Sequence, residues 1–155
     1  MNDLLEMPVR AAKPRATRAA PRKKILLVDD DPAVRQILLR LLSDEGYFVV
    51  TAANATEALR FSGLMMFDLV LMDVGPVAET GWEMFQRLRL KNPRLAFIMI
   101  TERSSRYFDA MAAGGGVFLE KPLDFTKLFF TLHNLLDGPA EIRLTRHLHV
   151  PLMAR

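Results

Sequence analysis

Five short apolar runs, separated by longer segments of mixed character, organise the middle of the chain. The runs are Lys24–Val28, Phe48–Ala52, Phe67–Met72, Leu95–Ile100 and Val117–Leu119. Continuous apolar runs of this length are typical of strands that are buried on both faces, as in a parallel sheet. The pattern therefore predicts five buried strands.

The segments that follow these runs carry helix signals. Asp31-Pro32 is a favourable helix start, because Asp caps free N–H groups and Pro suits the first helical position. The apolar stripe predicted for this helix, which Gly46 would end, comprises Val34, Ile37, Leu38, Leu41 and Leu42. Further helices are predicted at Asn54–Gly63, Gly81–Leu90, Ser105–Ala113 and Asp124–Asp137, the last with Leu128, Phe129, Leu132, Leu135 and Leu136 turned inward. Alternating strands and helices predict an α/β fold with a doubly wound, five-stranded parallel sheet.

Charge divides the chain unevenly. Residues 1–24 contain seven Lys or Arg and two Asp or Glu, whereas residues 25–137 contain eleven and fifteen. We therefore predict a flexible basic arm at 1–23, one domain at 24–137 and a tail at 138–155. For the arm, a solvated leader is favoured over contact with a nucleic acid. The tail has scattered apolar residues and could be a strand, a packed arm or a dimer contact.

Composition excludes several classes of protein. The chain has no cysteine, which rules out disulfides and thiol chemistry. No apolar stretch approaches the length of a membrane span, and the N-terminus lacks a secretory core. A cytoplasmic protein with no membrane contact is expected.

Charged residues stand where three of the predicted strands end. Asp29, Asp30 and Asp31 follow the first strand, Asp73 follows the third, and Lys121 follows the fifth. The carboxyl ends of parallel strands lie along one edge of the sheet, where ligands bind in such folds. Three carboxylates and an ammonium at that edge suit a divalent metal and a phosphoryl group.

Each of these residues also has a simpler interpretation. Asp31 is most simply a helix cap, and Asp29 and Asp30 could be solvated charges at the strand end. Asp73 could be a turn residue, and Lys121 could be a surface lysine. Thr101 is a common strand residue, and Phe118 is most simply part of the core. Only the combination, in this order and at these strand ends, favours a phosphoryl site.

The motifs as a set resemble the receiver domain of bacterial two-component response regulators. They are ILLVDDDPAVRQIL, FDLVLMD, FIMIT and the AGG–VFLEKP segment, and the resemblance covers residues 24 to 137. It implies a flavodoxin-like (βα)5 fold with strand order 2-1-3-4-5. It also implies a cis bond before Pro122 and an aromatic switch at Phe118.

The resemblance implies a role for each site residue. Asp73 would be the phosphorylated nucleophile. Magnesium would be bound by Asp30, Asp73 and the backbone carbonyl of Gly75, with Asp29 acting mainly through water. The phosphoryl oxygens would be bound by Thr101 and Lys121.

The chain departs from the family pattern in three places. In the loop VGPVAETGW, Pro76 falls one position early and Thr80 replaces an acid. Glu102 follows Thr101 where a small residue is usual, so its charge should oppose an incoming phosphoryl group unless Arg103 or solvent screens it. The stretch from Thr101 to Lys121 is shorter than expected, and the shortening falls in the predicted fourth helix.

The main hypothesis is a stand-alone phosphoacceptor, not an enzyme with a separate catalytic domain. A sensor histidine kinase would phosphorylate Asp73, and the face formed by the predicted fourth helix and fifth strand would bind a downstream protein or a second copy. The alternative is a degenerate receiver, a protein-interaction module that no longer depends on phosphorylation; Glu102 and the altered loop favour it. A nucleotide-binding protein of the same topology is disfavoured, because no Gly-rich loop follows the first strand.

Overall fold

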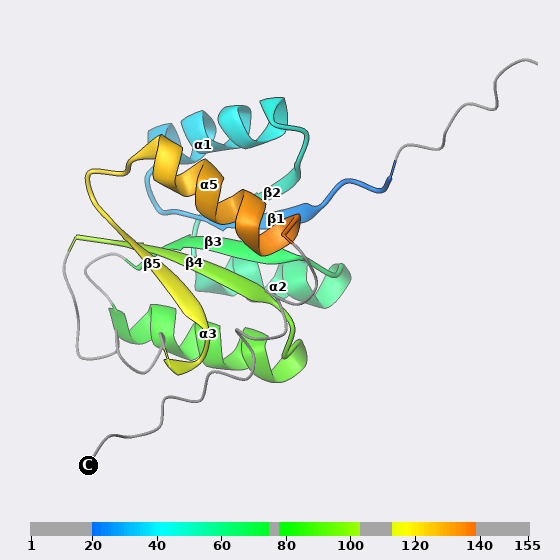
Figure 1. The fold of residues 1–155 in the computed structure, drawn as a ribbon. Coiled ribbons are helices and arrows are strands. Elements are labelled where there is room, and N and C mark those ends of the chain that lie inside the picture. Colours follow the sequence, from blue (N-terminus) through cyan, green and yellow to red (C-terminus); the bar gives the residue numbers. More distant parts are fainter. Residues whose placement is uncertain (1–19, 75–77, 103–112, 139–155) are drawn as a thin grey trace, which may run out of the picture.

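A parallel five-stranded sheet forms the centre of the molecule (Figure 1). The computed structural model describes residues 20–74, 78–102 and 113–138. The elements are β1 (Lys24–Val28), α1 (Pro32–Asp44), β2 (Phe48–Ala52), α2 (Ala55–Leu64), β3 (Leu69–Asp73), α3 (Ala78–Lys91), β4 (Ala96–Thr101), β5 (Gly116–Glu120) and α5 (Phe125–Leu136). All neighbouring strands are parallel, in the order β2-β1-β3-β4-β5. The predicted doubly wound fold and strand order are confirmed.

Helices cover both faces of the sheet, with α1 and α5 on one side and α2 and α3 on the other (Figure 1). Successive strand residues point to opposite faces, so the strands supply two core clusters. In β1, Ile25 and Leu27 pack in the cluster under α1 and α5, whereas Leu26 and Val28 pack in the cluster under α2 and α3. Because both faces are covered, the strands are mostly apolar rather than alternating, and most of their charged or polar residues stand at strand ends.

The predicted helix starts are confirmed by their caps. The Asp31 carboxylate accepts hydrogen bonds from the backbone N–H groups of Ala33 (2.8 Å) and Val34 (3.3 Å). The side chain of Asn54 caps α2, and that of Asp124 caps α5. These caps place the helix N-termini at the same edge as the strand ends that precede them.

Burial in the helices confirms the stripe of α5 and corrects that of α1. In α5, Leu128, Leu132 and Leu136 are buried, and Phe129 and Leu135 are partly buried.

In α1, Leu38 and Leu42 are buried and Leu41 is partly buried, but Val34 is 38% exposed and Ile37 54% exposed. Ile37 lies about 100° around the helix from Leu38, and Val34 lies in the first turn, at the edge of the sheet.

Two further boundaries, the starts of α3 and β3, differ from prediction by two residues or more. Helix α3 begins at Ala78, three residues before the predicted Gly81, because Ala and Glu are good helix formers and the glycine does not end the helix. Strand β3 begins at Leu69, and Phe67 is buried just before it.

Some sequence predictions cannot be compared with the structure. The helix predicted at Ser105–Ala113 lies outside the described residues except for Ala113, and the basic arm before residue 20 and the tail after Gly138 lie outside them too. Among the residues that are described, no helix is long and apolar enough to cross a membrane.

Candidate functional site

The predicted site residues come together at the carboxyl edge of the sheet. Asp29 follows β1, Asp73 ends β3, Thr101 ends β4 and Lys121 follows β5. The ladders continue to this edge, since the N–H of Val74 bonds to the carbonyl of Ile100 and the N–H of Lys121 to that of Thr101, both at 2.9 Å. Residues far apart in the sequence are thereby fixed on four adjacent strand ends.

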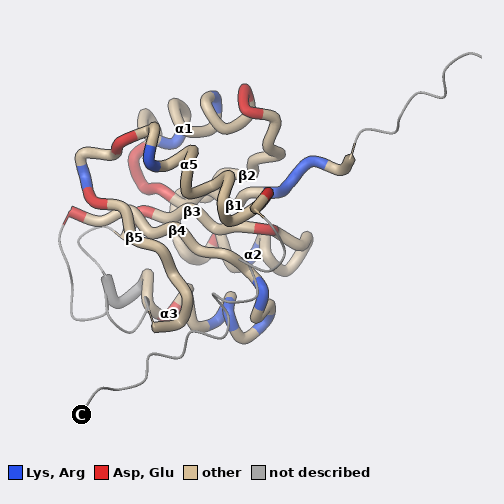
Figure 2. The backbone as a smooth tube through the Cα atoms, viewed as in Figure 1, with Lys and Arg blue, Asp and Glu red and all other residues tan. Residues whose placement is uncertain are grey.

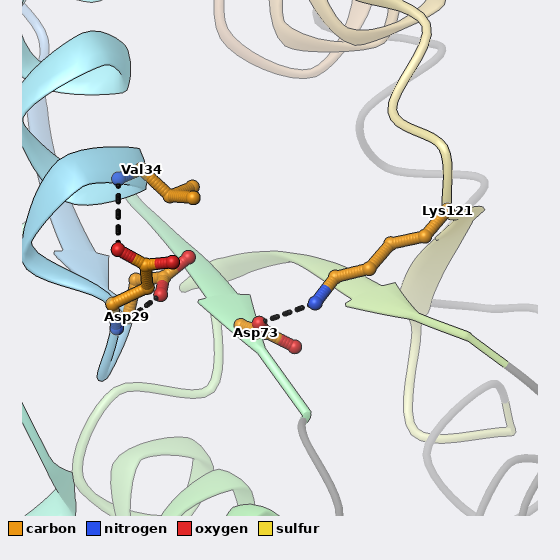
Figure 3. A network of polar contacts seen from close by, with 5 residues as sticks. Asp29, Val34, Asp73 and Lys121 are labelled. Carbon is orange, nitrogen blue, oxygen red and sulfur yellow. Dashed lines mark hydrogen bonds and ion pairs between the residues drawn. The ribbon is translucent and has the colours of Figure 1, made fainter.

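Lys121 forms an ion pair with Asp73 across the end of β4. Its Nζ lies 2.7 Å from Oδ2 of Asp73, and the two side chains are 34% and 10% exposed. Figure 3 shows Lys121 extending from the end of β5 toward Asp73 at the end of β3. The hydrogen bond to Asp73 is the main cause that raises the pKa of Lys121, with smaller contributions from the charges of Asp73, Glu102 and Asp29 against an opposing effect of burial. The ammonium is therefore charged at neutral pH.

Asp29, Asp30 and Asp73 offer carboxylate oxygens that all lie within 4.8 Å of one another. Asp29 is buried, Asp73 is partly buried and Asp30 is exposed. Hard oxygen donors at this spacing fit Mg²⁺. Figure 2 shows acidic residues at this edge, where the ends of β1 and β3 meet.

Burial is the main cause that raises the pKa of Asp29, and the charges of Asp73 and Asp30 act in the same direction. The N–H of Asp31, which donates to Oδ1 of Asp29 at 2.8 Å, lowers it in part. Like-charge crowding follows from placing three carboxylates at one strand edge. The structure adds that desolvation of Asp29 is the larger effect.

One supporting residue was missed in the sequence. The guanidinium of Arg35 donates to the carbonyl oxygen of Asp29 at 2.7 Å, which holds the loop between β1 and α1. The signal that could have identified it is its position one helical turn after the capping Asp31. The Asp31 carboxylate itself is used in the cap, as predicted.

Of the remaining predicted residues, Thr101, Phe118 and Pro122 lie in the part of the chain that the structure describes, and Gly75 does not. Thr101 is 9% exposed, and Phe118 is partly buried against the core cluster under α2 and α3, as expected of a core residue. The bond between Lys121 and Pro122 is cis, as the resemblance implies. Gly75, the predicted carbonyl ligand, lies outside the described residues.

The fold and the site together define a doubly wound α/β protein with a cluster of three carboxylates beside a lysine. The model of the response regulator receiver domain family matches residues 25–133. The chain belongs to this family and is a receiver domain of the two-component response regulators.

Relatives and solved structures agree with this assignment. Transcriptional regulatory protein GlrR of Escherichia coli (strain K12) is 35% identical over 119 residues, which cover 75% of this chain and 27% of GlrR. ZraR of Klebsiella oxytoca is 38% identical over 114 residues, 72% of this chain and 26% of ZraR. The chain thus spans about a quarter of the length of these curated relatives.

Two solved structures have the same fold over most of the described chain. Chemotaxis protein CheY4 of Vibrio cholerae has a TM-score of 0.67 at 32% identity, covering 75% of this chain and all of that one. Response regulator TrrA of Thermotoga maritima, solved in complex with Mg²⁺-BeF, has a TM-score of 0.66 at 32% identity, covering 74% of this chain and 99% of that one.

Proposed function

We propose that Asp73 accepts a phosphoryl group from a phosphohistidine of a sensor histidine kinase. An Asp73 oxygen would attack phosphorus and form an O–P bond, while the N–P bond breaks and the imidazole leaves with a proton. The contact that supports this role is the 2.7 Å pair between Lys121 and Asp73, beside two further carboxylates. Asp73 is the only member of this acidic group at the end of β3, with an ammonium within hydrogen-bond distance.

Lys121 and Thr101 would bind the phosphoryl oxygens. Lys121 is a point charge on a flexible stem, so it can exchange the Asp73 carboxylate for the more highly charged aspartyl phosphate. Thr101 stands on β4, between the nucleophile and the lysine, and would donate its hydroxyl. Both residues would act mainly on the charge that develops during transfer.

Asp30 and Asp73, with the carbonyl of Gly75, would bind Mg²⁺, and Asp29 would act through water. The support is the oxygen donor set, whose atoms lie within 4.8 Å of one another. When bound, the metal would neutralise the carboxylates and the incoming phosphoryl group. Without a cation, these charges oppose the approach of any anionic donor.

Output would pass from the site to a protein partner. We propose the face of residues 105–113 and β5 as the downstream surface, with a homodimer as a further possibility. The receiver domain of NtrC4, described as a beryllofluoride-activated dimer, is 26% identical with a TM-score of 0.65 and covers 74% of this chain. Contact of the arm at 1–23 with a nucleic acid is not part of the proposal.

We also propose that the chain acts as a stand-alone cytoplasmic receiver, with an arm at 1–23, its domain at 24–137 and a tail at 138–155. An antibody against this domain should detect a cellular product near 17.6 kDa. A product of the length of the curated relatives would contradict the stand-alone proposal and leave the site chemistry intact.

The central experiment is phosphorylation by acetyl phosphate with magnesium, followed by intact-mass spectrometry. The wild type should gain one phosphoryl mass, and Asp73→Asn should gain none. Asp44→Asn, which removes an acid at the end of α1 away from the site, is the matched control and should be phosphorylated like the wild type. Equal phosphorylation of Asp73→Asn and wild type would reject the nucleophile.

A further inference from the structure

A hollow opens at the amino edge of the sheet, opposite the acidic site. It lies between the C-terminal ends of α2 and α3, and its empty space, including the open mouth, is about 300 Å³. The inner wall is apolar and includes Leu26, Val70, Leu88 and Leu95. The hollow therefore belongs to the face of the sheet under α2 and α3, away from the phosphoryl site.

The two helix ends that frame the hollow are joined by one contact. The ammonium of Lys91, at the end of α3, donates to the carbonyl oxygen of Ser62 in α2 at 3.0 Å. Met66, which lines the hollow, is 65% exposed, and the neighbouring Leu64 is 77% exposed. Large apolar side chains are therefore exposed to water beside the apolar hollow.

The size of the hollow favours one inserted side chain. Pockets for small ligands enclose most of the ligand, whereas the empty space of this hollow includes its open mouth. Methionine side chains such as Met65 and Met66 adapt to different apolar partners. An apolar side chain from a protein segment fits such a place better than an enclosed metabolite does.

Basic residues lie at the mouth and next to residues that line it. Lys91 lines it, Arg94 lies exposed in the turn after α3, and Lys24 is on the same face of β1 as Leu26, since alternate strand residues share a face. Asp68 is the acidic residue nearby, and it accepts a hydrogen bond from the N–H of Lys24 at 2.8 Å. Figure 2 shows basic residues at the C-terminal end of α3 and in the segment before β1.

This charge argues against occupants supplied by the chain itself. Residues 1–24 carry seven Lys or Arg against two acids, and residues 138–155 carry three Arg against one Glu. Either segment would bring positive charge to a positive rim, and a second copy docked by the same surface would bring the same cations. Like charges at an interface oppose association.

We propose that this surface, formed by Leu64, Met66, Lys91 and Arg94 around the hollow, docks an acidic amphipathic segment of a partner protein. An apolar side chain of the segment enters the hollow, and its carboxylates face Lys91 and Arg94. This mode of recognition combines an apolar anchor with complementary charge at the rim. The protein would thereby have a second binding surface, at the amino edge of the sheet, which the phosphoryl chemistry does not use.

The test uses the full chain, isotope-labelled for NMR, and three synthetic helical peptides. The first has Leu and Phe on one face and Asp and Glu on the other. The second replaces the acids by Lys, and the third replaces the apolar residues by Ala. Only the first should shift the amide signals of residues 62–67 and 88–95.

Three variants sharpen the test. Met66→Gln should weaken binding of the acidic amphipathic peptide about tenfold, since one apolar contact is lost. Arg94→Glu should weaken it most at low salt. Phe130→Gln is the matched control, because Phe130 is 69% exposed on α5 at another surface, and it should leave binding unchanged. All three variants should accept phosphate from acetyl phosphate as the wild type does, which separates this proposal from that for Asp73.

Several results would overturn the proposal. These are absence of shifts at millimolar acidic peptide, equal binding of the Lys peptide, or shifts confined to other elements. If the wild type sediments with anionic vesicles and Met66→Gln does not, the surface would be assigned to membrane binding. A dimer that Met66→Gln dissociates would assign it to a second copy, and shifts at residues 62–67 on deletion of residues 139–155 would assign it to the tail.

Discussion

The two edges of the sheet differ in what the ends of the strands carry. At the carboxyl edge, three carboxylates lie with their oxygens within 4.8 Å of one another, and one of them, Asp29, is buried. At the amino edge, an apolar hollow is bordered by Lys91 and exposed methionine. The first edge crowds three carboxylates beside the ammonium of Lys121, and the second leaves apolar surface in water. Each edge is locally unfavourable in the isolated chain, in a way that a different ligand would relieve.

The largest expected effect comes from removing the cation of the carboxyl edge. Lys121→Ala should slow phosphorylation by acetyl phosphate about a hundredfold or more, because the phosphoryl oxygens lose their charged partner. Lys127→Ala, on the exposed side of α5, is the control and should react normally. Rates within a factor of about two of the wild type would place Lys121 outside the transfer chemistry.

Magnesium should stabilise the carboxyl edge by binding only the folded state. At a concentration about a hundredfold above Kd, the gain in unfolding free energy is about 2.7 kcal/mol. Asp30→Ala should abolish this gain and raise the melting temperature of the metal-free protein, since it removes one of the repelling charges. If millimolar magnesium leaves the melting temperature of the wild type unchanged, the metal site is wrong.

The buried Asp29 should leave a pH signature in the metal-free protein. Because its folded pKa is raised above the unfolded value of 3.8, folding favours the protonated form. Its contribution is therefore fully present below 3.8 and is lost as the pH rises through the folded pKa. Denaturant titrations from pH 3.5 to 7 should show that Asp29→Asn gains stability over the wild type as the pH rises. A constant difference between the two proteins would contradict the raised pKa.

The smallest expected effect concerns Glu102, whose charge contributes to the raised pKa of Lys121. Glu102 immediately follows the strand that separates the nucleophile from the lysine. Glu102→Gln should speed phosphorylation by acetyl phosphate a few-fold at low salt and less at high salt, because ions screen the repulsion. Glu83→Gln, an exposed acid on α3, is the control. Glu102 is exposed, so equal rates at both salt levels would show that its charge does not act on phosphorylation and would weaken the degenerate-receiver alternative.

The sequence by itself determined the sheet and the identity of the charged residues. Apolar runs identified all five strands, because strands covered by helices on both faces are mostly apolar. The expected full burial holds for the inner strands, whereas β2 and β5 at the sheet edges are only partly buried. The pairs Asp31-Pro32 and Asn54-Ala55 marked helix starts, since capping is a local interaction between neighbouring residues. The placement of Asp29, Asp73 and Lys121 followed from topology, because parallel strands end at one edge.

Tertiary structure decided what depends on distance and solvent. The burial of Asp29, the 2.7 Å pair of Lys121 with Asp73 and the support from Arg35 are set by neighbours from other elements. The exposure of Ile37 could not be predicted from the sequence either. The spacing of apolar residues identifies which face of a helix is apolar, but not how much of that face the sheet covers. The hollow beside Met66 arises where α2 and α3 end over the sheet, and packing between elements of that kind has no local signature in the sequence.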